Sequence, residues 1–113
     1  MEYYIKCPIT QKDAQRVSEL VREIRNNPSS NLHKKKVVNI IHCLSENALD
    51  YFFMFPIEII KVGKFGKKMS QMGIKSGLSV ISRVSKKIFD NLSEEQLLKF
   101  ADYLESLIIV DTA

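Results

Sequence analysis

Apolar residues recur at intervals of three, four and seven along four segments of the chain, and this spacing limits the possible folds more than any other feature. Residues at such intervals line one side of an α-helix. The pattern predicts helices over residues 11–26, 32–60, 67–89 and 94–109. Because the connections between them are short, neighbouring helices should run antiparallel. We therefore expect an all-α protein, a small antiparallel four-helix bundle.

Local signals mark several helix ends. Thr10, with an acidic residue three positions later, and the Ser93–Gln96 capping box are typical of helix starts. Pro28 ends the first helix, because the residue before a proline avoids the helical conformation. Pro56 lies within the second apolar stripe without changing its register, so we expect a kink there and not an end.

Two further segments depart from the helical pattern. Residues 61–66 contain two glycines, each of which disfavours a helix interior by about 1 kcal/mol, so we expect a break between the second and third helices. Residues 1–9 alternate apolar and polar side chains but have no second strand to pair with. They are expected to form a short extended N-terminal arm lying on the core.

Bulk properties are those of one globular domain, residues 1–113. Apolar residues make up 45% and charged residues 27% of the chain, which excludes a disordered composition. Cys7 and Cys43 match no metal or redox spacing, so we expect reduced thiols and a cytoplasmic protein. The first residues do not resemble a signal peptide, and the most apolar stretch, residues 51–60, is too short to span a membrane.

Basic residues are concentrated in the third quarter of the chain. Between Lys61 and Lys87 there are eight basic residues, no acidic residue and all four glycines. Residues 51–90 carry a net charge of +6 and residues 91–113 carry −4, within a total of +4. This asymmetry points to a partner surface on the third helix. The residues we expect to contact the partner are Lys61, Lys64, Phe65, Lys68, Met72, Lys75, Arg83 and Lys86.

Several partners fit such a surface. It could be only a solvated face, with Lys86 and Lys87 turned toward Glu94 and Glu95. It could bind an acidic surface of another protein or of a second copy of the chain. The amphipathic segment 59–89 could instead lie on an anionic membrane. Nucleic acid is the weaker candidate, because one arginine and few stacking aromatics accompany the lysines.

Small residues on the third helix form a second pattern, at intervals of three, four, three and four. Such a seam lets two helices approach closely. It could pack against a bulky neighbour in the same chain, such as Phe52 or Phe55, or it could receive a second copy or a partner helix. The residues of this helix-packing seam are Gly63, Gly66, Ser70, Gly73 and Gly77.

Candidate catalytic residues are few. His42, Glu46 and Asp50 are spaced four apart and should form one row on the second helix. A metal site would need further ligands, and the Glu-x-x-His pairs of di-metal bundles are absent from the sequence. His33 is expected at the surface, beside Lys34–Lys36. We therefore expect no catalytic site, no metal and no cofactor. The sequence predicts a non-enzymatic interaction module: an adaptor, regulator or inhibitor.

Overall fold

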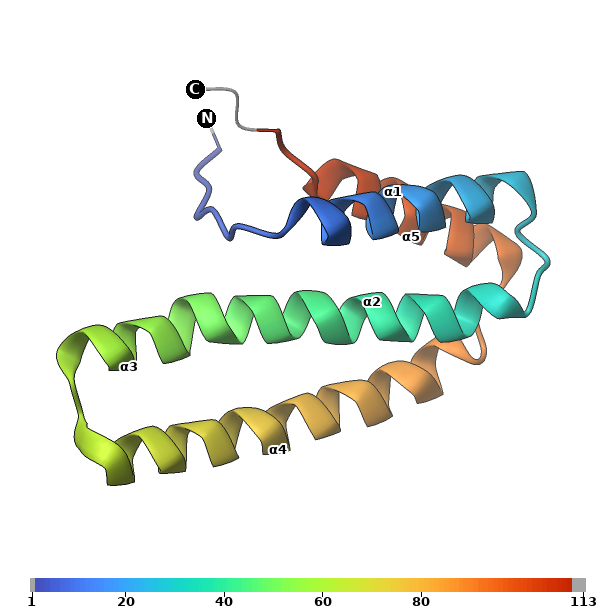
Figure 1. The fold of residues 1–113 in the computed structure, drawn as a ribbon. Helices are drawn as coiled ribbons and strands as arrows, with labels where there is room; N and C mark the ends of the chain where they lie inside the picture. The colour runs from blue at the N-terminus through green and yellow to red at the C-terminus, as the bar shows by residue number, and fades with distance from the viewer. Residues whose placement is uncertain (1, 111–113) are drawn as a thin grey trace.

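A computed structural model of the chain describes residues 2–110, and helices dominate it (Figure 1). These described residues contain no β-strand. The helices are α1 (Gln11–Asn26), α2 (Leu32–Leu49), the π-helix η1 (Asp50–Met54), α3 (Phe55–Ile60), α4 (Gly63–Phe89) and α5 (Glu94–Leu107). The all-α prediction is confirmed, and the predicted bounds of the first helix match α1. The closed antiparallel bundle remains a prediction.

The core lies between α1, α5 and α2. α1 contacts both α5 and α2, and α4 lies on the other side of α2 (Figure 1). Leu78 and Ser85 are the buried residues of α4. At its C-terminal end, Phe89 stacks edge-on with Phe100 of α5, their ring centroids 4.9 Å apart. The buried apolar cluster consists of Val17, Leu20, Val21, Ile24, Val37, Ile40, Leu97, Ala101 and Leu104.

The molecule is longer than a compact domain of its size. Its radius of gyration is 16.2 Å, whereas a compact chain of this length has about 13 Å. Helix lengths explain the difference. At 1.5 Å per residue, the continuous helical segment 32–60 is about 43 Å long, and α1 is about 24 Å long. The shorter pair α1 and α5 therefore covers only part of the long hairpin formed by α2–α3 and α4 (Figure 1).

The second helix continues past Pro56, as predicted, but it does so through the π-helical turn η1. Pro56 has no N–H, and its ring crowds the carbonyl four residues earlier. In η1 the N–H of Phe55 donates to the oxygen of Asp50, five residues back. Such a widened turn accommodates a proline inside a helix.

The expected break over residues 61–66 is wrong in its extent, because α4 begins at Gly63 and not at Lys67. Within residues 61–66, only Lys61 and Val62 lie outside the helices. Lys61 takes the left-handed conformation with a φ of 55°, and Gly63 follows with a φ of 86°. Two residues with positive φ so close together reverse the chain direction, so the next helix, α4, begins at Gly63. Gly66 therefore lies inside α4.

The N-terminal arm does not lie on the core. The described residues 2–10 form neither helix nor strand, and Tyr3, Tyr4 and Ile5 are exposed. The alternating pattern therefore describes an exposed tail.

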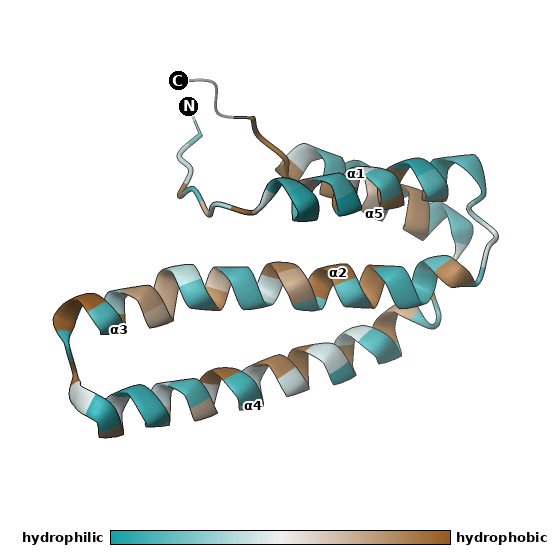
Figure 2. Cartoon of the chain, in the orientation of Figure 1, coloured by the Kyte–Doolittle hydropathy of each residue, from teal (hydrophilic) through white to brown (hydrophobic). Residues whose placement is uncertain are grey.

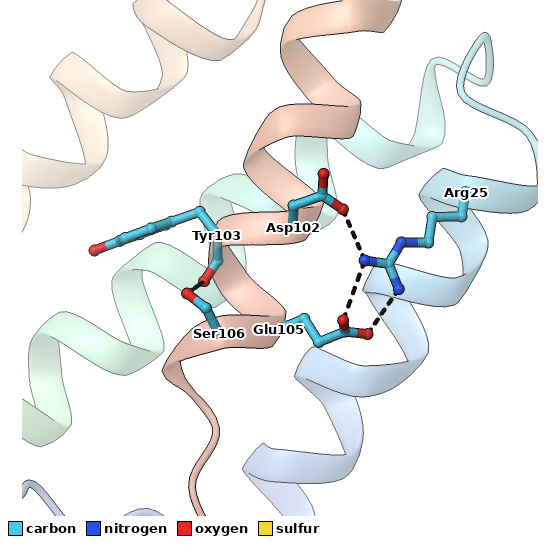
Figure 3. A network of polar contacts seen from close by, with 5 residues as sticks. All are labelled: Arg25, Asp102, Tyr103, Glu105 and Ser106. Carbon is cyan, nitrogen blue, oxygen red and sulfur yellow. Dashed lines mark hydrogen bonds and ion pairs between the residues drawn. The ribbon is translucent and has the colours of Figure 1, made fainter.

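Arg25 links α1 to α5 at the surface. Its guanidinium donates to Asp102 Oδ1 and Glu105 Oε2, each at 2.7 Å (Figure 3). These charge-assisted bonds raise the pKa of Arg25 and lower the pKa of Glu105. The groups are largely exposed, so water weakens their net effect.

We expect Ile24→Ala to lower the free energy of unfolding by about 2–5 kcal/mol, because Ile24 is fully buried in the core. Ile59→Ala removes the same atoms from an exposed side chain of α3, and should cost less than about 0.5 kcal/mol. Urea denaturation measures both variants. Equal losses would show that α3 belongs to the core.

We also expect an acid-dependent contribution from the Arg25 cluster. Because the pKa of Glu105 is lowered in the folded state, its carboxylate stabilises the fold above its unfolded pKa. That contribution is lost as the pH falls through the lowered pKa. Arg25→Gln should lower the melting temperature at pH 7 and flatten its decline below about pH 4.5. Melting curves of both proteins from pH 7 to about pH 2 test this, and parallel declines would contradict it.

Candidate interaction surface

The predicted contact residues come together because α4 is one continuous helix. Seven of the eight lie on it, and Lys61 caps the end of α3 just before it. At 3.6 residues per turn, the seven fall within an arc of about 100° and extend over about 33 Å. All eight are exposed. We call the seven the α4 basic face: Lys64, Phe65, Lys68, Met72, Lys75, Arg83 and Lys86.

The charges of this face are not neutralised within the part of the chain that the structure describes. Lys67 pairs with Glu58 at 3.6 Å, but it lies outside the face. The alternative in which Lys86 and Lys87 pair with Glu94 and Glu95 is not found among residues 2–110. Glu95 pairs instead with Lys99 on its own helix, at 3.6 Å. The five cations of the face therefore point a concentrated positive charge at solvent.

The expectation that the helix-packing seam meets a bulky neighbour in the same chain is also wrong. A Cβ added at Gly73 or Gly77 would have no neighbour from another helix within 4 Å in residues 2–110. Phe52 and Phe55, the proposed neighbours, are themselves about half exposed. A Cβ added at Gly66 would be crowded only by Val62, whose Cγ2 would lie 2.9 Å away. The seam is thus open to a second copy or a partner.

A groove of about 570 Å³ separates the two legs of the hairpin. One wall carries Glu46, Asp50 and Glu58, and the other carries Gln71 and Lys75. The remaining lining is apolar: Met54, Phe55, Ile74 and Leu78. Lys75 of the α4 basic face therefore lies at a groove whose other wall is acidic.

His42 connects α2 to α4 through a residue that sequence reasoning missed. Its Nδ1 lies 2.7 Å from Ser82 Oγ, and its Nε2 lies 3.4 Å from Glu46 Oε2. The three groups are aligned as hydroxyl, imidazole and carboxylate, an order that can activate a hydroxyl. The imidazole is 43% exposed and the carboxylate is 53% exposed. Asp50 is not part of this contact and lines the groove.

His33 is buried, and its expected surface position is wrong. Its Nε2 lies 2.5 Å from the carbonyl oxygen of Asn27, which places the start of α2 against the end of α1. Lys34 beside it donates to the carbonyl oxygen of Asp90, at 2.7 Å. The start of α2 therefore lies next to the end of α4.

No metal-ligand cluster and no membrane-spanning helix are found in residues 2–110. They contain no group of three or more His, Cys, Asp or Glu side chains placed to hold a metal ion. No described helix is long and apolar enough to cross a membrane. Cys7 and Cys43 are free thiols, and burial raises the pKa of Cys43.

The aromatic residues of the second stripe are where sequence reasoning failed most. Phe52, Phe55 and the aliphatic Ile59 continue the apolar spacing of the second helix, which is typical of a buried side, yet all three are exposed. The spacing was correct, but no helix covers that part of the stripe. The relative lengths of the predicted helices could have shown that part of the stripe is exposed, since a helix over residues 11–26 is too short to cover all of residues 32–60.

Comparison with known proteins found no matching family model, no matching curated protein and no matching solved structure.

Because the seam is open, we expect Gly73→Ala with Gly77→Ala to raise the free energy of unfolding by about 1–2 kcal/mol, through better helix propensity. Gly63→Ala is the control and should destabilise, because its φ of 86° suits glycine alone. Urea denaturation and sedimentation equilibrium measure both effects. If the double variant is less stable or changes its oligomeric state, another chain covers the seam.

Proposed function

We propose that this protein is a non-enzymatic helical interaction module, an adaptor, regulator or inhibitor, that binds an acidic surface of another protein through the α4 basic face. The observation that carries this proposal is the row of five exposed cations on one helix, without ion-pair partners in residues 2–110. Such a row attracts acidic partners and speeds their encounter. Phe65 and Met72 add apolar contact area within the same face.

A non-enzymatic role agrees with the environment of His42. The His42–Glu46 pair is about half exposed, so water screens the charges that would activate Ser82. We propose that this contact serves to hold α2 against α4. We further propose that the helices form an antiparallel bundle in solution, and that the protein is cytoplasmic, where Cys7 and Cys43 remain reduced.

The experiment compares two charge reversals of equal size. Lys75→Glu/Arg83→Glu/Lys86→Glu changes the α4 basic face, and Lys12→Glu/Arg22→Glu/Lys35→Glu changes exposed cations elsewhere. Proteins captured from the native cell by the wild type are identified by mass spectrometry, and the purified partner is then titrated against all three forms. We expect the first variant to lose affinity about tenfold or more, and the wild-type complex to weaken with salt.

Both variants should unfold at nearly the wild-type temperature, since exposed charges change stability by about 0.5 kcal/mol or less each. Retention of every partner by the first variant would show that the face is only solvated. Loss of partner binding in both variants would show that net charge, and not this face, governs binding.

A further inference from the structure

The end of the long hairpin exposes an unusual amount of apolar surface. We call residues 51–72 the hairpin tip, which comprises η1 after Asp50, α3, the turn and the start of α4. Large patches of this kind on a water-soluble chain mark sites of interaction with a protein or a membrane. The exposed apolar side chains of the tip are Tyr51, Phe52, Phe53, Phe55, Ile59, Ile60, Val62, Phe65, Met69 and Met72.

The most exposed of these residues lie at the turn itself. Ile60 is 68% exposed and Phe65 is 79% exposed, on either side of the turn between α3 and α4. Figure 2 shows the end of α3 as hydrophobic, followed by a turn that is hydrophilic and then hydrophobic, at the extremity of the molecule. α1 and α5 do not reach this end (Figure 1). The apolar surface at the turn is therefore a projecting end.

Lysines accompany the apolar residues. The tip carries Lys61, Lys64, Lys67 and Lys68 against the single carboxylate of Glu58. Glu58 is already paired with Lys67. The remaining three cations are exposed, and their long side chains can keep the ammonium groups at the polar boundary while the apolar residues go deeper.

We propose that the hairpin tip docks this protein on a bilayer rich in anionic lipids. A projecting apolar end whose lysines lie beside the apolar residues matches the layers of such a bilayer, because the long lysine side chains reach back to the headgroups. Ile60, Val62 and Phe65 enter the boundary between headgroups and acyl chains, and Lys61, Lys64 and Lys68 meet the anionic headgroups. Charge complementarity thus selects the bilayer as the occupant.

This inference goes beyond the proposed function, because it adds apolar insertion into a lipid surface. The tip shares Lys64, Phe65, Lys68 and Met72 with the α4 basic face, so the residues beyond it distinguish the two proposals. Lys75, Arg83 and Lys86 lie farther along α4 and stay outside the bilayer, available to an acidic protein. Apolar insertion together with lysine–headgroup attraction supplies the two signals that stable peripheral binding needs.

The test uses vesicles of phosphatidylcholine, with and without about one third phosphatidylserine. Wild type should sediment with the anionic vesicles and not with the neutral ones. Ile60→Ser/Phe65→Ser should bind about tenfold more weakly or worse, because it removes the insertion and keeps the charge. Ile109→Ser/Val110→Ser is the matched control, since those side chains are 67% and 78% exposed at the other end of the chain. It should bind like wild type.

A second measurement reports insertion directly. The chain contains no tryptophan, so Phe65→Trp places a single reporter in the tip and Val110→Trp places one outside it. Anionic vesicles should shift the emission of the first to the blue and leave the second unchanged. The inference is overturned if wild type ignores anionic vesicles, or if both serine variants bind equally.

It is also overturned if the Phe65→Trp emission shifts only with a purified protein partner or with increasing protein concentration, since the tip would then bind a protein or a second copy. Lys75→Glu/Arg83→Glu/Lys86→Glu separates the two proposals. It should lose the protein partner and keep the blue shift of Phe65→Trp on anionic vesicles. A failure of the proposed function therefore leaves the vesicle result intact.

Discussion

The apolar stripe of α1 is the interaction on which the rest of the structure depends. Val17, Leu20, Val21 and Ile24 are almost fully buried, and α1 is in contact with both α5 and α2. Without this stripe, α5 would have little to pack against within residues 2–110. Because α1 has only 16 residues, the core it organises is short. The long hairpin of α2–α3 and α4 therefore extends beyond the core, and its far end is left without cover.

This mismatch in length leaves two surfaces of different chemistry exposed, and they overlap at the start of α4. The α4 basic face is inexpensive to keep in water, because exposed charges are well solvated and change stability little. Leaving the apolar hairpin tip exposed to water is unfavourable, since burying apolar surface is the main favourable contribution to folding. An exposed apolar end is thus stronger evidence of a function than an exposed basic face. Together, the two proposals describe a module that holds a protein at a membrane.

The turn at the end of the hairpin determines how the basic residues are arranged. Lys61 takes the left-handed conformation and Gly63 has a positive φ, and together they reverse the chain. Only Lys61 and Val62 separate α3 from α4. A longer break would have placed Lys64 outside α4. Because the helix restarts at Gly63, Lys64 keeps the same helical phase as Lys68, Lys75 and Lys86. The local backbone at the turn therefore decides that the cations form one face.

The sequence by itself determined the helices, because helical spacing and capping are local properties. The bounds of α1, the capping box at Ser93 and the continuation past Pro56 could all be read from neighbouring residues. It also placed the contact residues on a basic segment. Only the tertiary structure decided which apolar residues are buried, since Val37 and Phe52 share one stripe but only Val37 lies under α1. The buried position of His33, the contact of Ser82 with His42 and the open seam likewise depend on which helices meet. Periodicity identifies the apolar side of a helix, but the lengths and positions of the other helices determine whether anything covers it.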